Sequence, residues 1–183
     1  MKKTTFLLII FICLYSFSYS QEFGYNTTDI GAEYNWSPNA STYSLQLAFN
    51  AKTHHSLIVR GGYNKVQSDP STADNNESGT GWSASLGYRY YIKILPRRFY
   101  IGARIEVSNL EINWSKLIGG GTSKIMVLQP SVETGYTLLI NELFFITPYV
   151  AAGYQTTLKT NGAAVSFGNG FVPLAGISAG FRF

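Results

Sequence analysis

Two adjacent histidines, His54 and His55, are the residues of this chain that come nearest to a reactive or metal-binding pair. A zinc site needs additional His, Cys or carboxylate ligands that converge on one point, and neighbouring turn residues usually point apart. The chain has no other histidine, and its one cysteine, Cys13, lies in the apolar stretch near the start. Nothing near the pair completes a set of nucleophile, base and orienting group. We therefore interpret both histidines as solvated turn residues and predict no catalytic or metal site.

Two polar strings have the composition of ligand-binding loops. Residues 119–124 are glycine-rich but lack the Gly-x4-Gly-Lys-Ser/Thr spacing of a phosphate-binding loop, and no helical pattern follows them. Residues 68–78 offer carboxylate and hydroxyl oxygens, which could hold calcium weakly, but not in the Asp-x-Asp-x-Asp-Gly register. We predict that both strings are loops and that the protein uses no cofactor.

Eight charged residues alternate with apolar ones and form the best candidate for a site. They are four acids and four arginines: Asp29, Glu33, Glu106, Glu133, Arg60, Arg89, Arg104 and Arg182. An isolated ion is costly to remove from water, whereas paired ions with additional hydrogen bonds are tolerated. Equal numbers of the two signs therefore favour a neutral, packed polar interior with a structural role. The alternative is a solute pathway or a gate.

These charges fall in six of eight segments in which apolar and polar residues alternate with a period of two. The segments cover approximately residues 28–36, 43–50, 57–64, 82–90, 99–107, 124–138, 146–154 and 171–183. Such alternation is typical of β-strands with one apolar and one polar face. No convincing helical periodicity follows the first 20 residues. The sequence therefore predicts an all-β chain.

The lengths of the connectors indicate two different ends. Short links at residues 51–55, 94–98 and 139–144 alternate with longer ones at 65–81, 109–123 and 156–170, and the first hairpin, at 37–40, is the one short link among the long ones. An even number of strands, each long enough for a tilted path across a bilayer, predicts an up-and-down transmembrane barrel with tight periplasmic turns. We expect residues 67–79, 110–122 and 158–169 to form a variable contact surface.

Aromatic residues on the apolar face gather near both predicted ends. Near the loop end they are Tyr34, Trp36, Tyr43, Tyr63, Trp82, Tyr154 and Phe171, and near the turn end Phe49, Tyr90, Phe99, Tyr136, Phe181 and Phe183. Leu, Ile, Val and Ala dominate between them. Two aromatic girdles around an aliphatic band are typical of a membrane barrel, which turns its apolar face to lipid.

The first 20 residues have the order of a secretory signal peptide. Lys2 and Lys3 precede an apolar run, and small residues at Ser18 and Ser20 follow it. We predict cleavage after Ser20, so that residues 21–183 form a single barrel domain without cysteine. Lys and Arg then fall from 14 to 12 against 10 acids, and a charge this small gives no argument for nucleic acid as a partner.

The strand at residues 146–154 and the ending Gly-Phe-Arg-Phe at 180–183 resemble those of small eight-stranded outer-membrane β-barrel proteins, similar in plan to OmpA/OmpX-type barrels. The resemblance covers roughly residues 22–183. It implies a bacterial outer-membrane location, lipids as partners, and Phe181 and Phe183 as the signal that the barrel-assembly machinery reads during insertion.

The sequence favours a non-enzymatic protein with a structural or surface-interaction role and an extracellular or envelope partner of unknown identity. Fold alone does not decide function, and three alternatives remain. One is a narrow channel or transporter for small or apolar solutes. The others are a lipid-modifying enzyme of the outer membrane and a secreted lipocalin-like barrel, which would turn the apolar face inward around a ligand.

Overall fold

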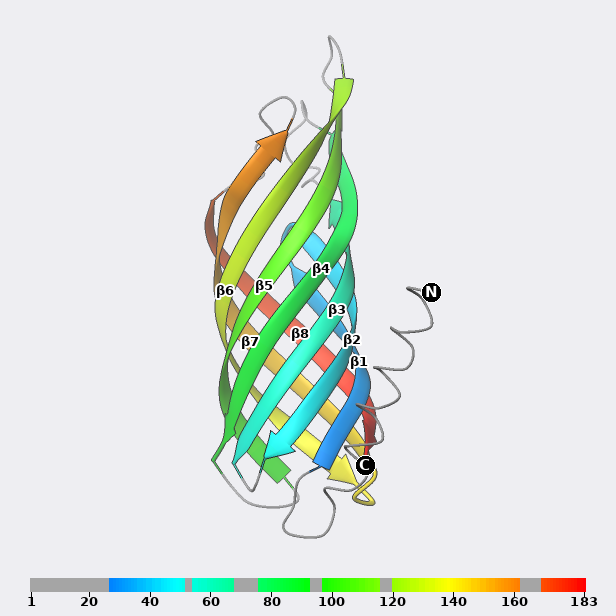
Figure 1. Ribbon diagram of the computed structural model, residues 1–183, viewed down its shortest axis with the longest axis vertical. Coiled ribbons are helices and arrows are strands. Elements are labelled where there is room, and N and C mark those ends of the chain that lie inside the picture. The colour runs from blue at the N-terminus through cyan, green and yellow to red at the C-terminus, as the bar shows by residue number, and fades with distance from the viewer. Residues whose placement is uncertain (1–26, 52–53, 68–75, 93–96, 116–119, 162–168) are drawn as a thin grey trace, which may run out of the picture.

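The protein is a closed barrel of eight antiparallel strands (Figure 1). The structure is a computed structural model that describes residues 27–51, 54–67, 76–92, 97–115, 120–161 and 169–183. The strands are β1 (Thr27–Ser37), β2 (Ala40–Ala51), β3 (His55–Gln67), β4 (Asn76–Tyr91), β5 (Arg97–Ser115), β6 (Gly120–Ile140), β7 (Phe144–Asn161) and β8 (Gly170–Arg182). This architecture confirms the predicted all-β, eight-stranded antiparallel barrel. The predicted signal peptide lies outside the described residues.

Pairing between β1 and β8 closes the ladder. Asp29 lies opposite Arg182, and the register continues without interruption to Trp36 opposite Ala175. At the seam, the Thr28 N–H donates to the Phe183 carbonyl at 2.9 Å, and the Phe183 N–H donates to the Thr28 carbonyl at 2.8 Å. Closure removes the open sheet edges, whose unpaired backbone groups would be very costly in hydrocarbon. Among the described residues there is no helix that could span a membrane.

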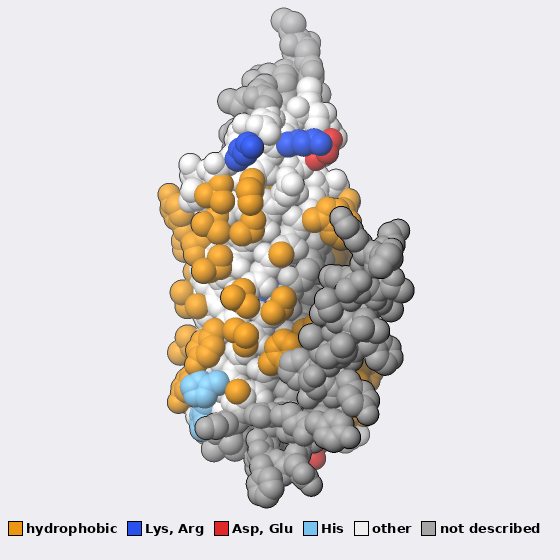
Figure 2. Space-filling view, in the orientation of Figure 1, with side chains coloured by type: hydrophobic (Ala, Val, Ile, Leu, Met, Phe, Trp, Pro, Cys, Tyr) orange, Lys and Arg blue, Asp and Glu red, His pale blue; other side chains and the backbone are white. Residues whose placement is uncertain are grey.

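The outer surface carries the apolar face of the strands. Leu45 and Trp82 are 73% and 72% exposed, whereas Ile58 and Tyr100 on the inner face are fully buried. Hydrophobic side chains form a broad band around the middle of the visible face, with basic side chains above it (Figure 2). This orientation is the one predicted for a membrane barrel, and it is the reverse of a lipocalin-type interior.

The strands at the loop end are longer than the sequence analysis predicted, and this corrects the expected loops. β5 and β6 contain 19 and 21 residues, and they remain in register as far as Ser115 opposite Gly120. Their hairpin rises above the other strands (Figure 1). Most of the predicted loop at 110–122 is therefore strand. The connections between strands at this end shrink to residues 68–75, 116–119 and 162–169.

Two local features mark the two ends of the barrel. At the turn end, Asn141 and Glu142 have φ values of 52° and 58°, and the Leu143 N–H donates to the Ile140 carbonyl at 3.3 Å, as in a tight hairpin turn of type I′. Towards the loop end, the β6–β7 register shifts between Met126 and Val127. Bulges of this kind are frequent at barrel rims.

Candidate functional site

The eight charged residues singled out in the sequence all lie on the inner face of the barrel and are buried. The structure divides them into a pair at the seam and a network across the middle of the lumen. Their structural role remains a prediction, but their geometry decides how much of the lumen is free.

The seam pair joins the first and the last strand. Arg182 donates from Nε to Asp29 Oδ1 at 2.6 Å and from Nη2 to Asp29 Oδ2 at 2.7 Å. Such a two-pronged contact matches the planar guanidinium to the carboxylate and is stronger than a single hydrogen bond. It therefore links β1 to β8 at the level where the chain closes on itself.

Glu33, Arg60 and Arg104 form one side of the central network. Arg60 Nε donates to Glu33 Oε2 at 2.9 Å, and Arg104 Nη1 lies 3.3 Å from Glu33 Oε1. These residues come from β1, β3 and β5, so the contacts cross the lumen rather than joining neighbouring strands.

Glu133 on β6 is the other centre of the network. Its Oε1 accepts from Arg89 Nε at 2.6 Å, its Oε2 accepts from Arg104 Nη2 at 2.7 Å, and Arg60 Nη2 lies 3.7 Å from Oε1. The Glu133 side chain is 1% exposed. Three arginines therefore share this carboxylate, two of them also with Glu33, and a charge left alone here would be very costly.

Aromatic rings pack below the network, towards the turn end. The Arg89 guanidinium lies 4.3 Å from the centre of the Tyr100 ring, and that of Arg104 lies 5.2 Å from the centre of the Tyr149 ring. Tyr91 joins the two tyrosines in a buried cluster. These cation–π contacts fix the flat guanidinium groups and fill the lumen below the charges.

A small polar cavity lies above the network. Its volume is about 40 Å³, enough for water but not for a larger solute. Glu106 borders it and lies 4.0 Å from Arg104, so this carboxylate connects the network to the cavity. The polar lining otherwise consists mainly of uncharged groups: Asn35, Asn64, Ser108, Gln129 and Gln155.

An apolar cluster inside the loop end was missed by the sequence analysis. It consists of Val66, Leu110, Ile112, Ile125 and Val127, all buried. Apolar and polar residues still alternate in this part of the sequence. Here, however, the apolar residues occupy the inward positions and the polar residues the outward ones, the opposite of the rest of the strand. On β5 the inward positions change from Arg104 and Glu106 to Leu110 and Ile112, while Asn109 and Glu111 face outward.

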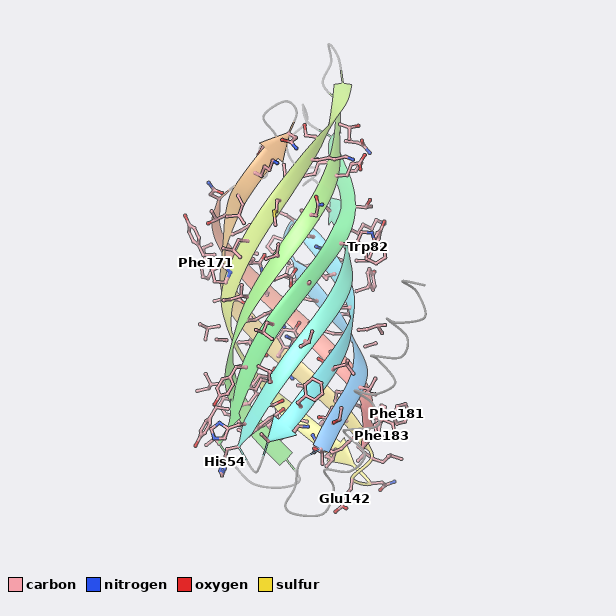
Figure 3. All side chains as sticks on the ribbon, in the orientation of Figure 1. His54, Trp82, Glu142, Phe171, Phe181 and Phe183 are labelled. Carbon is pink, nitrogen blue, oxygen red and sulfur yellow. The ribbon has the colours of Figure 1, made fainter. Side chains whose placement is uncertain are left out.

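The two histidines lie on the outer surface near the turn end, where Figure 3 labels His54. They are not simply solvated, which corrects that part of their interpretation. His55 begins β3 and is hydrogen-bonded through Nδ1 to the Tyr88 hydroxyl, and the His54 ring stacks on Tyr90 with 5.7 Å between centres. The pair thus belongs to an aromatic rim. The described residues contain no group of three potential metal ligands.

The predicted girdle residues lie on the outer surface of the barrel. All seven at the loop end are exposed, whereas Phe49 and Tyr136 at the turn end are half-buried. Figure 3 shows Trp82 and Phe171 in the upper half of the barrel and Phe181 and Phe183 near the lower end. The assembly-signal role of the last two stays a prediction.

Solved structures provide the comparison for this architecture. The N-terminal β-barrel domain of Pseudomonas aeruginosa OprF is similar with a TM-score of 0.60 and 16% identity, over 88% of this chain and 100% of that one. Neisserial surface protein A matches with a TM-score of 0.53 and 16% identity, over 86% and 94%. Ail of Yersinia pestis matches with 0.51 and 10%, over 86% and 96%. No protein-family model and no curated protein matches the chain.

The chain has the fold of the small eight-stranded outer-membrane β-barrels. Its exterior agrees with that fold, because an aliphatic band lies between exposed aromatic residues. The fold and the outer surface together place the protein in the bacterial outer membrane. They leave its specific role to be argued from the interior and the loop end.

Proposed function

We propose that the protein is a non-enzymatic outer-membrane barrel with a closed lumen, and that the projecting end of β5 and β6 is the surface it offers to partners. The ion-pair network packed across the lumen is the observation that supports this proposal. Arg60, Arg89 and Arg104 reach across it to Glu33 and Glu133, and all five side chains are at most 3% exposed. An eight-stranded barrel has room for little beyond its own side chains.

The loop end supports the second half of the proposal. Beyond the network the β5–β6 hairpin remains paired and encloses its own apolar cluster. A surface built on a packed core keeps its shape, and residues for binding are commonly displayed on such rigid supports. We infer that this end contributes contacts rather than catalysis.

Planar-bilayer recording tests the closed lumen. The folded mature protein is expected to give no steady current, and Glu106→Gln at the cavity is expected to leave the trace unchanged. A steady current whose ion selectivity changes in Glu106→Gln would show that the charges line a pathway, and it would favour the channel alternative.

A polyanionic ligand is the first contact to test. A similar barrel, Ail, has been solved in complex with the heparin analogue sucrose octasulfate, and here Lys124 and Lys159 are exposed at the loop end. Titration with sucrose octasulfate should show binding that weakens in the double variant Lys124→Gln/Lys159→Gln. Equal binding by both proteins would exclude the two lysines as the site, and no binding by either would remove this class of ligand from the proposal.

A further inference from the structure

Four aromatic side chains form a continuous row across the outer face of β1 to β4. The register places Tyr34 opposite Tyr43, Tyr43 opposite Tyr63 and Tyr63 opposite Trp82. The ring centres of Tyr34 and Tyr43 are 5.2 Å apart, and those of Tyr63 and Trp82 are 5.4 Å apart. All four side chains are exposed, so the row forms a raised edge on the outside of the barrel.

The next outward row towards the turn end consists almost entirely of small residues. From β8 to β4 it reads Ala179, Ala32, Leu45, Gly61 and Ala84. A Cβ added at Gly61 would meet nothing within 4 Å. Apart from Leu45, which is 73% exposed, this row is therefore lower than the aromatic row beside it.

Large side chains return in the row that follows. It contains Phe181, Ile30, Leu47, Val59 and Leu86. The small residues thus lie between two rows of bulky ones. A groove of about 550 Å³ follows the aromatic side of the small residues and is lined mainly by Tyr34, Tyr43, Leu45, Tyr63, Trp82 and Ile177, with Ala32, Gly61 and Ala179 also in its lining. The lining is apolar on a surface that faces hydrocarbon, so the groove takes an apolar occupant.

A cation lies on the other side of the aromatic row. Lys65 follows Tyr63 by two residues on the same face of β3, about 7 Å further along the strand, and the register places it between Ser41 and Thr80. In order from the loop end, the surface therefore presents a cation with two hydroxyls, an aromatic row and an apolar groove. A lipid presents the same order of chemistry, with a charged headgroup at the interface and an acyl chain below it.

We propose that this groove binds one acyl chain of an anionic membrane lipid whose phosphate pairs with Lys65. A second copy of the chain fits less well, because a stable protein interface uses roughly 20–30 residues a side and the groove is lined by a smaller set. A flexible chain needs only a narrow apolar track. The charge above the track selects an anionic headgroup over a zwitterionic one.

Native mass spectrometry of the folded, detergent-solubilised mature protein tests the proposal. The probes are dioleoyl phosphatidylglycerol and dioleoyl phosphatidylcholine, which share their chains and differ in headgroup charge. Gly61→Leu fills the groove from the outside, and Ala32→Leu is a second filling variant in case the first fails to fold. Ala103→Leu adds the same bulk as Ala32→Leu at an exposed position of β5, away from the groove, and serves as the matched control. Heat-modifiable gel mobility verifies folding of each protein.

Wild type and Ala103→Leu should retain phosphatidylglycerol with equal affinity, and the filling variants should bind both lipids at least about tenfold more weakly. Lys65→Gln should weaken phosphatidylglycerol about fivefold and leave phosphatidylcholine unchanged. Unchanged lipid affinity in a folded groove-filling variant would overturn the proposal. A wild-type dimer that disappears in the same variant would overturn it too, by showing that a second copy occupies the groove.

Discussion

The membrane-spanning part and the loop end of the barrel have opposite polarity. On β5, Ile101 and Ile105 face outward while Arg104 is buried inside; further along the same strand, Glu111 is exposed and Ile112 is fully buried. The spanning part is apolar outside and polar inside, and the loop end has the arrangement of a water-soluble protein. The difference shows that a single strand can pass from lipid into water when its apolar residues change from the outward to the inward positions.

The change of phase locates the membrane border. It falls between Val107 and Asn109 on β5 and between Met126 and Lys124 on β6, and the register places Asn109 opposite Met126. The bulge in β7 lies at the same level, because the register shift follows Met126.

Removing the centre of the polar interior should have the largest effect on stability. Glu133→Gln leaves three buried arginines with less compensation, and the expected loss is about 3–5 kcal/mol of unfolding free energy. The matched control is Glu111→Gln, whose carboxylate lies 3.6 Å from Lys124 with 54% of the side chain exposed, and the expected loss is about 0–1 kcal/mol. Urea unfolding in lipid vesicles measures both. Similar losses would mean that the interior network is no more important than a surface pair.

Truncation inside the loop end should destabilise that end locally. Ile112→Ala opens a cavity in the apolar cluster and should cost about 2–5 kcal/mol. Ile105→Ala removes the same atoms from a lipid-facing position, where lipid chains fill the space, and should cost less. Hydrogen exchange should show faster exchange at 108–115 and 120–127 in the first variant alone. Uniform exchange across all strands would contradict a separate core at the loop end.

A lysine introduced at different outward positions of β5 should locate the membrane border. Ile105→Lys places an ammonium group in the apolar band and is expected to lose about 2–4 kcal/mol, whereas Asn109→Lys, one outward position above Val107, is expected to lose about 0–1 kcal/mol. Folding into vesicles of defined composition gives both values. Equal losses would mean that the border lies elsewhere.

The smallest effect is expected at the turn end. Glu142 holds a left-handed backbone conformation, which costs a side-chain-bearing residue about 1–2 kcal/mol and glycine much less. Glu142→Gly should therefore stabilise the barrel by about 0.5–1 kcal/mol in the same unfolding assay. A loss of stability would show that the Glu142 side chain makes a contact that outweighs the strain.

The sequence was sufficient to predict the strands and to predict which residues share one face of a strand. Alternation at 99–107 predicted that Arg104 and Glu106 share a face and that Ile101 and Ile105 share the other, because strand geometry fixes this without any knowledge of neighbours. The pairing of Glu33 with Arg60 and Arg104 could not be predicted in the same way. It depends on the stagger of the closed barrel, which brings distant strands together across the lumen.

Two other features could be recognised only from the pairing register of the strands. The loop-end cluster was hidden because Leu110 and Ile112 continue the alternation of β5 in inverted phase, and the sequence analysis assigned polar outward residues such as Asn109 to a loop. The outer groove was hidden because Ala32, Gly61 and Ala84 lie far apart in the chain. Only the pairing of β1 to β4 shows that these small residues form one row.

Spin-label scanning along β5 tests the inversion of polarity most directly. Single cysteines at the outward positions 101, 103, 105, 107, 109, 111 and 113 of a protein spanning residues 21–183, a stretch without cysteine, would carry the label in reconstituted vesicles. Labels at 101–107 should collide mainly with oxygen, which dissolves in lipid, and labels at 109–113 mainly with a water-soluble nickel complex, with the change between 107 and 109. High nickel accessibility at all seven positions, or no change along the strand, would contradict the account.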